Sequence, residues 1–393
     1  MFLFYLGARF AHPRLISFRP AGAEYVTVVN SFVCGRLDSV SGNSLKHDTF
    51  QGEMKSETQK SELAGQPDGA GERVAGESLP VCPVCRNTEF RTLFEATDRL
   101  YHTTDRKFQI VECKQCRLTR LFPPPGAGEL RAHYPDTYWF SPEEETVDRL
   151  GEIYRRFVLR DHVSFVCRAL ESYQTDGLVL DVGCGGGLFL KMLAERGYRV
   201  AGLDFSHDAA RLAWRGNGVP AVCATLSKAP FAPGSCAAVT MFHVLEHVYD
   251  PHSYLAEARA LLKPEGCLIV QVPNAACWQL KLLGKRWSGL DVPRHLWNFR
   301  PSDLDLLLDR TGFEVVRRKY FSLRDNPAGL ATSLAPALDP MARRIRRLGE
   351  SPRSQLCKNL IYFCLVAACL PFAFLEAACH AGSTIMVEAR RKS

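Results

Sequence analysis

The segment that decides the fold is LVLDVGCGGG at residues 178–187. Its first three residues are an apolar run, and residues 188–196 then have the pattern of a helix that Gly197 ends. A strand, a glycine turn and a helix in this order bring backbone N–H groups and a helix N-terminus against a ligand. The segment therefore predicts an α/β domain with a binding loop after its first strand.

A second apolar run at residues 199–203 ends at Asp204. An acid at the tip of the second strand is placed to accept hydrogen bonds from both hydroxyls of a ribose. A glycine turn alone is a weak signal, but a turn followed by Asp204 at this distance indicates a cofactor that contains adenosine.

The loop differs from a dinucleotide-binding loop, which needs the pattern G-x-G-x-x-G. Gly183 and Gly185 fit that pattern, but its third glycine position holds Leu188, and the glycine stands at Gly187 instead. Asp181 stands two residues before the first glycine. With no pyrophosphate to accommodate, such a loop can approach an amino-acid tail, and Asp181 can hold the loop and an ammonium group.

These residues resemble the first motif of the class I S-adenosylmethionine-dependent methyltransferases. Later segments continue the resemblance: PFAPGS at 230–235, VTMFHVLEHV at 239–248, LLKPEGCLIV at 261–270, PRHLWNF at 293–299, LDLLL at 304–308 and GFEVV at 312–316. The resemblance implies a Rossmann-like sheet of seven strands and methyl transfer from S-adenosylmethionine. The cofactor site that it implies consists of Asp181, Gly183, Gly185, Gly187, Asp204, Phe205, Leu226 and His243.

The chain departs from the family pattern at two places. The family usually has an acid after the third strand that holds the adenine amino group, whereas this chain has CATL at 223–226. Backbone groups near Leu226 could still bind the adenine edge. The family also tends to open its fourth strand with Phe-Asp, where this chain has two alanines at 237–238. We expect an active enzyme, and a non-catalytic scaffold that binds the cofactor is the alternative.

Histidines are the candidates for catalysis. His243, Glu246 and His247 have the spacing of the H-x-x-E-H zinc peptidase motif, but they follow a strand of a cofactor-binding sheet, which argues against a peptidase. For a hydroxyl acceptor the enzyme must position the acceptor and remove a proton, and His243, His247 and His295 are the candidate bases. Two alternatives remain: Glu246 and His247 only cap and pack the turn, or the turn binds a divalent ion as in related ubiquinone-pathway O-methyltransferases.

A cysteine module precedes these motifs. Cys82 and Cys85 form one Cys-x-x-Cys pair, and Cys113 and Cys116 form a second pair after 27 intervening residues. Two such pairs are the arrangement that tetrahedral Zn²⁺ needs, and four protein ligands make a structural site. The sequence therefore predicts a zinc-ribbon-like module in which residues 90–111 form a hairpin. Four unrelated thiols or a redox pair are the alternative.

Composition limits the class of protein. The chain has 393 residues, 49 Lys+Arg against 42 Asp+Glu, and 46% hydrophobic residues, so it is globular and mildly basic. Its 15 cysteines are too few for a disulfide scaffold, which favours a reducing, cytoplasmic compartment. The predicted divisions are a disordered or mis-assigned extension at 1–80, the zinc-ribbon-like module at 81–120, a linker and helical lead-in at 121–175, and the methyltransferase domain at 176–392. Within the lead-in, YPDTYW at 134–139 supplies aromatic surface that could close over a neighbouring site.

An insertion at 341–380 separates the predicted sixth strand at 313–317 from a last strand at 383–389. Residues 341–358 carry six basic residues against Glu350, and residues 360–375 are sixteen apolar residues. A membrane-spanning helix needs about 20 residues, and a single crossing would separate the last strand from its sheet. We therefore expect a helix that lies on an anionic membrane or covers a lipid-like acceptor. Burial against the Rossmann core is the alternative.

The function expected from these features is O-methylation of a small-molecule, saccharide or lipid-linked acceptor. No nucleic-acid partner is expected, and the location is cytoplasmic with peripheral membrane contact. The alternative is a nucleic-acid methyltransferase whose zinc module binds RNA. Against it, residues 272–274 are VPN rather than the start of an Asn-Pro-Pro-Tyr motif, and no basic and aromatic stripe accompanies the cysteines.

Overall fold

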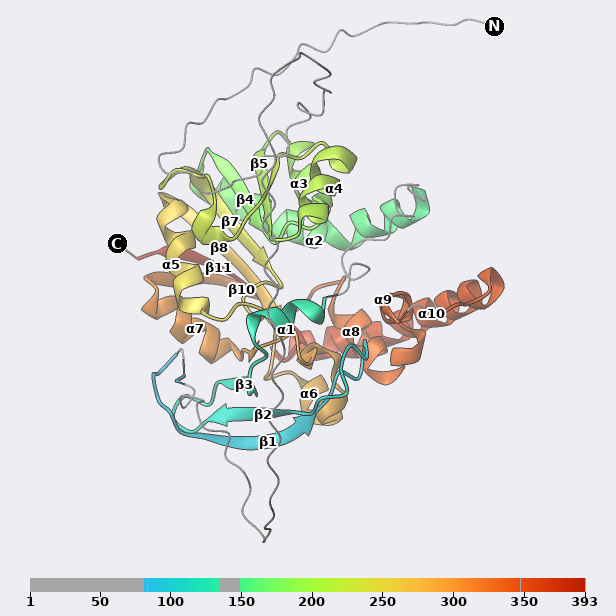
Figure 1. The fold of residues 1–393 in the computed structure, drawn as a ribbon. Coiled ribbons are helices and arrows are strands. Elements are labelled where there is room, and N and C mark those ends of the chain that lie inside the picture. Colours follow the sequence, from blue (N-terminus) through green and yellow to red (C-terminus); the bar gives the residue numbers. More distant parts are fainter. Residues whose placement is uncertain (1–80, 83, 135–148, 347, 393) are drawn as a thin grey trace, which may run out of the picture. The chain divides into compact units, whose positions relative to one another are not determined.

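The structure is a computed structural model, and it describes residues 81–82, 84–134, 149–346 and 348–392 (Figure 1). The prediction for residues 1–80 lies outside this part of the chain. The described residues form two β-sheets and the helices that pack on them.

The larger sheet has seven strands and confirms the predicted α/β fold. All neighbouring strands in it are parallel except β11, which runs antiparallel to both β8 and β10. The predicted last strand is therefore inserted between β8 and the edge strand. The order is β10-β11-β8-β7-β4-β5-β6, with β4 (Leu178–Val182), β5 (Arg199–Asp204), β6 (Ala221–Cys223), β7 (Cys236–Phe242), β8 (Leu262–Pro273), β10 (Phe313–Lys319) and β11 (Thr384–Arg391).

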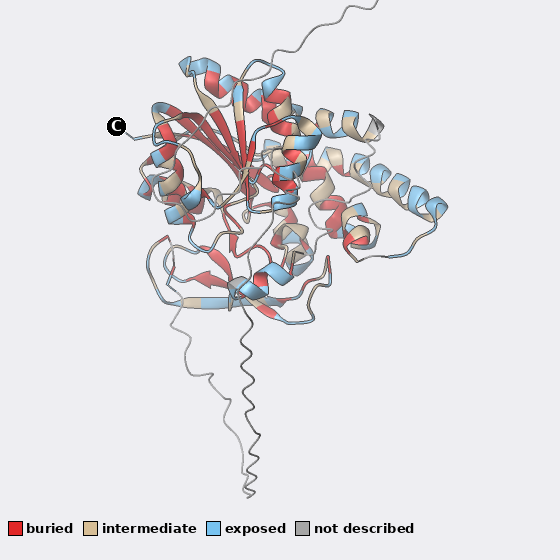
Figure 2. Cartoon of the chain, turned by 45° about the horizontal axis from the view of Figure 1, so that its top comes forward, coloured by how far each residue is buried: buried red, intermediate tan, exposed pale blue. Residues whose placement is uncertain are grey.

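Side chains along β4 alternate between the two faces of this sheet. Val179 belongs to the buried cluster on one face, and the next residue, Leu180, belongs to the cluster on the other face. Strands that are covered on both faces are mostly apolar, and β4 is apolar except for Asp181. Helices α2 (Arg149–Tyr173), α3 (Leu188–Ala194) and α4 (His207–Asn217) pack on the first face, and α5 (Pro251–Leu261) and α7 (Pro301–Arg310) on the second. Figure 2 shows the buried strands between these helices.

Polar caps start two helices directly after the strands. The Ser206 hydroxyl accepts a hydrogen bond from the Ala209 N–H at the start of α4, and the Asp250 carboxylate accepts one from the His252 N–H at the start of α5. Pro301 begins α7, where its missing N–H costs nothing. These residues fix where the three helices begin.

The smaller sheet has four strands in the order β1-β2-β3-β9. Their bounds are β1 (Phe90–Ala96), β2 (Phe108–Cys113), β3 (Thr119–Phe122) and β9 (Trp297–Asn298), and α1 (Ala127–Ala132) follows β3. Strands β1 and β2 form the predicted hairpin, and β2 ends at the first cysteine of the second pair. Strand β9 comes from the segment PRHLWNF, so distant parts of the chain share this sheet.

Arg294 lies in the turn before β9 and connects this turn to loops that adjoin the smaller sheet. Its side chain is fully buried and binds Asp98 at 2.9 Å and Asp291 at 2.8 Å. Its guanidinium also lies over the Tyr101 ring at 4.4 Å and donates to the His133 carbonyl. One side chain therefore joins the turn at residues 291–294 to residues 98–101 and to residue 133.

Helices fill the connection around β10 and before β11. They are α6 (Trp278–Leu283), α8 (Asn326–Leu334), α9 (Pro340–Ile345) and α10 (Pro352–Ala378), with the short 3-10 turns η3 (Gly284–Arg286), η4 (Ser288–Leu290) and η5 (Pro336–Leu338). A further 3-10 turn, η2 (Leu226–Lys228), lies between β6 and β7. Helix α10 contains the apolar run and packs mainly against α8. Only Cys369, Ala373 and Glu376 of α10 are buried, so the helix is not enclosed in the core (Figure 2).

Candidate active site

The glycine loop connects β4 to α3 at the carboxyl edge of the larger sheet. Gly183, Gly185 and Gly187 have φ angles of 75°, 52° and 77°, a region that favours glycine. A side chain at Gly183 would place its Cβ 2.8 Å from Val244 Cγ2, and one at Gly187 would place it 2.9 Å from Ala213 Cβ. The loop thus needs glycine both for its conformation and for close packing.

Asp204, the last residue of β5, is buried and holds this loop. Its Oδ2 accepts a hydrogen bond from the Gly185 N–H at 2.9 Å, and its Oδ1 accepts one from the Ser206 N–H at 2.8 Å. Burial raises the pKa of Asp204, and the backbone N–H groups partly offset that rise. Each carboxylate oxygen keeps a lone pair for a ribose hydroxyl, so the predicted role fits the geometry.

Asp181 lies on the neighbouring strand β4 and is also buried. Its Oδ1 accepts a hydrogen bond from the Thr240 hydroxyl at 2.6 Å. Burial raises the pKa of Asp181 to about 7, so the carboxyl group is only marginally ionised at neutral pH. A cationic ligand group beside it would favour the carboxylate. The two buried acids at neighbouring strand ends therefore fit a cofactor that has both an ammonium group and a ribose.

Phe205 follows Asp204 and leaves 58% of its surface exposed. Its ring is 6.3 Å from the Tyr134 ring in an edge-on arrangement. A flat exposed ring at this strand end suits a purine base, which packs well on aromatic faces. Leu226 stands at the start of η2 with its side chain buried, so it offers the site only its backbone. The backbone contact to adenine stays a prediction.

His243 ends the stretch of β7 with a φ of 57°. Its Nδ1 is 3.1 Å from Glu246 Oε1, and its Nε2 is 3.5 Å from Asp325 Oδ2. Burial opposes the charged ring, but the carboxylates of Asp325 and Glu246 outweigh burial and raise the pKa of His243 to about 9. These carboxylates favour the imidazolium, whereas Gln271 Nε2, 2.8 Å from His243 Nε2 and 2.7 Å from Asp325 Oδ2, can donate to the ring only in its neutral form.

His247 and His295 lie side by side, with their ring centroids 4.7 Å apart. The Nδ1–H of His247 donates to the Arg294 carbonyl at 3.1 Å, and the Nδ1–H of His295 donates to the Gly289 carbonyl at 2.8 Å. The Tyr134 hydroxyl lies 2.9 Å from the same Nδ1 of His247. In the tautomer that satisfies both carbonyls, each ring holds its proton on Nδ1, the Tyr134 oxygen accepts from the His247 N–H as well, and each Nε2 is an acceptor. Burial, and then the neighbouring His295, lower the pKa of His247 to about 4, so His247 is neutral at pH 7.

Glu246 connects these histidines. It is fully buried; burial opposes its charge, but the hydrogen bond and charge of His243 lower its pKa, so it is ionised. Its Oε2 has no hydrogen-bond partner among the described residues. Ligand atoms of Glu246, His247 and His295 lie within 4.8 Å of one another. This group can take a proton from an acceptor hydroxyl at a histidine Nε2, and the same atoms could hold a divalent cation.

The four predicted metal ligands come together at the end of the β1–β2 hairpin. Cys82 Sγ is 3.5 Å from Cys116 Sγ, and Cys85 Sγ is 3.5 Å from Cys113 Sγ. All four sulfur atoms lie within 4.8 Å of one another. Tetrahedral zinc with Zn–S bonds of about 2.3 Å places its sulfurs about 3.8 Å apart, whereas a disulfide needs about 2.05 Å. The cluster fits Zn²⁺ and not a pair of disulfides.

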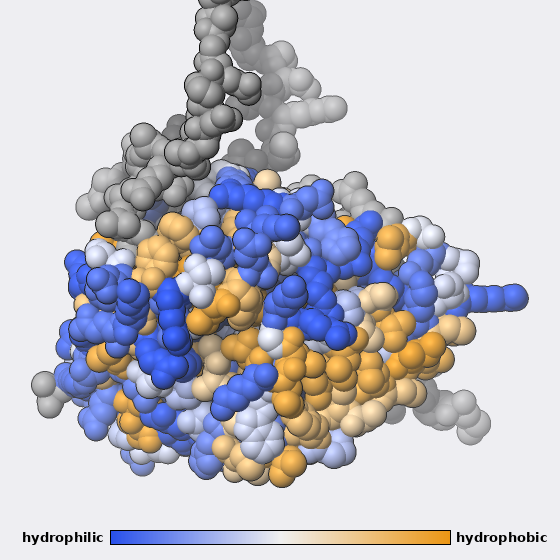
Figure 3. All heavy atoms as spheres, turned by 90° about the horizontal axis from the view of Figure 1, so that it is seen from below, coloured by the Kyte–Doolittle hydropathy of each residue, from blue (hydrophilic) through white to orange (hydrophobic). Residues whose placement is uncertain are grey.

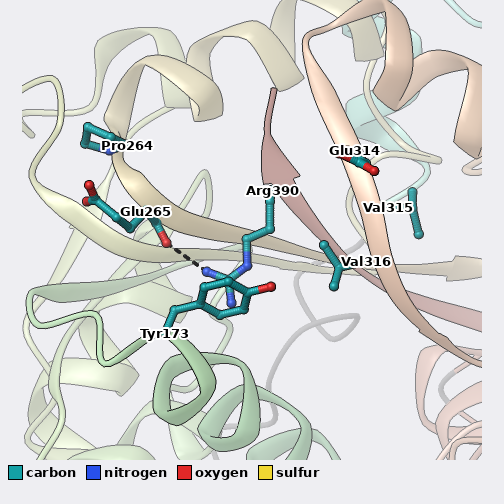
Figure 4. A pocket seen from close by; sticks show the side chains of 7 residues that line it. All are labelled: Tyr173, Pro264, Glu265, Glu314, Val315, Val316 and Arg390. Atoms are coloured by element: carbon teal, nitrogen blue, oxygen red, sulfur yellow. Dashed lines mark hydrogen bonds between the residues drawn. The ribbon is translucent and has the colours of Figure 1, made fainter. Parts of the chain in front are cut away.

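A surface pocket elsewhere contains none of these residues. It lies at the amino edge of the larger sheet and is lined by Tyr173, Pro264, Glu265, Glu314, Val315, Val316 and Arg390 (Figure 4). The Arg390 guanidinium lies 3.5 Å from the Tyr173 ring centroid and donates to the Glu265 carbonyl at 2.8 Å. Its charge is also balanced by Glu388. The charged group in this pocket is already paired within the protein, and no residue of the candidate active site lines the pocket.

Sequence reasoning missed Asp325 and Thr240. Asp325 precedes α8, and nothing in its local sequence shows that the fold brings it against His243. Tyr134 was predicted only as aromatic surface, and the structure shows its hydroxyl oxygen 2.9 Å from His247 Nδ1. The rest of that aromatic segment, 135–139, lies outside the described residues.

Comparison with known proteins gives consistent matches. A family model described as a methyltransferase domain matches residues 154–318. A ubiquinone biosynthesis O-methyltransferase from Cronobacter sakazakii is 34% identical over 173 residues, which cover 41% of this chain and 70% of that protein. Another, from Pectobacterium carotovorum subsp. carotovorum, is 33% identical over 185 residues, 43% of this chain and 76% of that protein. Among solved structures, a geranyl diphosphate C-methyltransferase from Streptomyces coelicolor A3(2) aligns with a TM-score of 0.40 and 16% identity over 65% of this chain and 89% of that chain.

Proposed function

This chain belongs to the class I S-adenosylmethionine-dependent methyltransferases, and from that premise we propose that it methylates a hydroxyl oxygen of a small molecule. Two relatives that it matches over more than two thirds of their length are O-methyltransferases. The observation that carries the proposal is the neutral His247, whose Nε2 is left as a proton acceptor beside the ionised Glu246. A hydroxyl acceptor needs such a base.

S-adenosylmethionine, when bound, supplies a methyl group that is activated by a positively charged sulfur. Asp181 would hold its ammonium group and Asp204 its ribose hydroxyls. His247 Nε2 would take the proton of the acceptor hydroxyl while the hydroxyl oxygen displaces the methyl group from the sulfonium sulfur, which would leave as the neutral thioether. The Arg294 carbonyl keeps the Nδ1–H of His247 in place, and the carboxylate of Glu246 would stabilise the imidazolium that results. His243 positions Glu246 through its Nδ1.

The proposal also covers the chemical class of the acceptor, the location of the enzyme in the cell and the division of the chain into domains. A saccharide or lipid-linked alcohol would also present a hydroxyl to His247. We place the enzyme in the cytoplasm at a membrane surface, because residues 341–380 contain the exposed apolar helix α10. We also propose that residues 81–120 act as a zinc-bearing module, that 121–175 are a lead-in, and that 176–392 form the methyltransferase domain.

Zinc content tests the module. Protein purified without chelators is expected to hold about one zinc per chain, because four cysteines saturate one tetrahedral ion. Replacing Cys113 with serine should reduce the zinc content to a small fraction of that value, measured by atomic emission. Cys357→Ser is the matched control, since Cys357 is an exposed cysteine on α10 and should leave the zinc content unchanged. Metal-free protein with four titratable thiols at these positions would contradict the zinc site.

Methyl transfer tests the function. Purified enzyme with S-adenosylmethionine labelled in its methyl group is incubated with fractionated cell extract, and label is expected in a small-molecule or lipid fraction. The labelled product should be a methyl ether, which shows a methoxy signal in NMR spectra and, unlike a methyl ester, releases no methanol on treatment with base. Label found only in RNA would instead support the nucleic-acid alternative. Failure of S-adenosylmethionine to bind in calorimetry would contradict the enzyme function itself.

A further inference from the structure

Helix α10 exposes an apolar surface that lacks charge. Residues 359–378 contain one charged residue, Glu376, and that carboxylate is buried and accepts hydrogen bonds from Gln279. A water-facing helix normally has a polar outer face. Instead, α10 turns outward six large apolar side chains that are each more than half exposed: Leu356, Leu360, Ile361, Phe363, Phe374 and Leu375.

The N-terminal turns of α2 extend this surface. Ile153 is 63% exposed and Phe157 is 50% exposed, and both lie on one face of α2 with Tyr154. The Tyr154 ring is 5.8 Å from the Phe363 ring of α10. We call these residues, with the six of α10, the α2/α10 surface. Figure 3 shows a broad hydrophobic area with hydrophilic residues beside it on the face seen from below. Exposed apolar areas of this extent mark contact with a protein or a membrane.

Basic residues border the surface. Arg353 and Lys358 stand on the first turns of α10, where Arg353 is exposed. Exposed Lys281, Lys285 and Arg286 lie on α6 and η3. Helix α6 is beside the C-terminal half of α10, since the rings of Trp278 and Phe372 are 6.3 Å apart. An apolar surface with a cationic border complements a leaflet of anionic lipids.

Both ends of α10 are anchored to the same body, so the helix lies along a membrane rather than across it. At its start, Lys358 and Arg343 both bind Glu350, at 2.8 and 2.7 Å. At its end, Glu376 binds Gln279 of α6, and β11 then pairs with β8 from Thr384 onward. By length and composition α10 could span a bilayer, but a crossing would pull one of these anchors away from the fold.

The α2/α10 surface adjoins the candidate active site. Helix α2, which carries Tyr154, reaches the site further along its length, where His162 Nε2 lies 3.9 Å from Asp325 Oδ2. Asp325 Oδ2 is in turn 3.5 Å from His243 Nε2. Helix α2 thus contacts α10 through Tyr154 and Phe363 near its start and the residues around His243 through His162 further along.

We propose that the α2/α10 surface rests on the anionic leaflet of a membrane and that the acceptor hydroxyl belongs to an amphiphile in that leaflet. The second half of this statement rests on the proposed methyltransferase function, and the first half does not. The occupant is a lipid surface, because a broad apolar area without charge is bordered by exposed basic residues.

Vesicle flotation of the full-length, zinc-loaded protein tests the surface. The protein is expected to float with phosphatidylcholine vesicles that contain about 30% phosphatidylglycerol, and to float less with phosphatidylcholine alone. The double variant Leu360→Asn, Ile361→Asn should lower the partition coefficient by about tenfold or more, because both side chains are over half exposed and would lose their apolar contact with lipid. Leu93→Asn and Val316→Asn remove exposed apolar side chains of β1 and β10 and should leave flotation unchanged.

Two further measurements separate the possible failures. Light scattering gives the mass in solution: a dimer that the Leu360→Asn, Ile361→Asn variant dissociates would show that a second copy covers the surface and would overturn the lipid assignment. Flotation that is absent, or equal in the variant, would overturn it as well. Calorimetry with S-adenosylmethionine should give the same affinity for the variant and the wild type. Wild-type protein that floats but does not bind the cofactor would refute the methyltransferase function and leave the membrane surface standing.

Discussion

Replacing Arg294 with methionine is expected to lower the free energy of unfolding by about 3–5 kcal/mol, the cost of removing one partner from a buried charge network. The change leaves Asp98 and Asp291 without the guanidinium that neutralises both of them. Burial opposes ionisation of Asp98, but Arg294 and Thr103 outweigh burial and hold its pKa at about 2. The variant therefore retains a buried carboxylate that the fold no longer compensates.

The sign of the pH dependence follows from Asp98. Its folded-state pKa of about 2 lies below its ordinary value of 3.8, so its contribution to stability is present above pH 4 and is lost as the pH falls towards 2. Denaturant titration at pH 7 therefore measures the full effect. Adding Asp98→Asn to the Arg294→Met variant should recover part of the loss, because it removes one of the uncompensated charges.

A matched control for this experiment is Arg106→Met. Arg106 binds Glu129 at 2.7 Å, but both side chains are about 40% exposed, and exposed pairs contribute at most about 1 kcal/mol. A loss below about 1 kcal/mol for Arg294→Met itself would show that the network is not what joins the two parts of the chain.

Replacing His247 with asparagine is expected to lower the rate of methyl transfer at least about hundredfold, the usual contribution of a general base. Asparagine can still donate a hydrogen bond to the Arg294 carbonyl, so the turn keeps its shape while the Nε2 lone pair is lost. Cofactor affinity should change less than about threefold, because His247 is not among the residues that hold the loop or the ribose. Single-turnover transfer into the labelled acceptor fraction and calorimetry measure the two quantities separately.

Two variants control this prediction. His252→Asn alters an exposed histidine on α5 and should leave both quantities unchanged. His295→Ala should lower the rate of methyl transfer less than His247→Asn does, because His295 only contacts the proposed base, His247, and is not itself the proton acceptor. If His295→Ala abolished transfer while His247→Asn retained it, the proton acceptor would be His295.

The sequence predicted those parts of the site that lie within one strand, the loop after it and the next helix. The glycine loop and Asp204 are local features, since a positive φ and a strand end depend on neighbouring residues. The four cysteines were readable for the same reason, because each pair sits in one turn. The hairpin between them followed from the length of chain available.

The sequence could not predict contacts between residues that are far apart in the chain. Asp325 determines the charge of His243, yet the two residues meet only because β10 and α8 return to the end of β7. Arg294 and Asp98 meet because β9 joins the smaller sheet. The choice among three histidines depended on these contacts, since hydrogen bonds to carbonyls and carboxylates decide which ring is neutral. For α10, the apolar run predicted a helix. The sequence could not predict how exposed its side chains are, because that depends on how much of the helix α8 and α6 cover.

The burial of Asp181 makes the binding of a cationic ligand group beside it depend on pH. Burial leaves the carboxyl group of the free protein with a pKa of about 7, so about half of the molecules carry a proton there in a neutral cell. A cation bound beside Asp181 would favour the carboxylate, so its binding would release a proton from those molecules that carry one. Acidification would therefore weaken the binding of such a cation, and alkalinity would strengthen it.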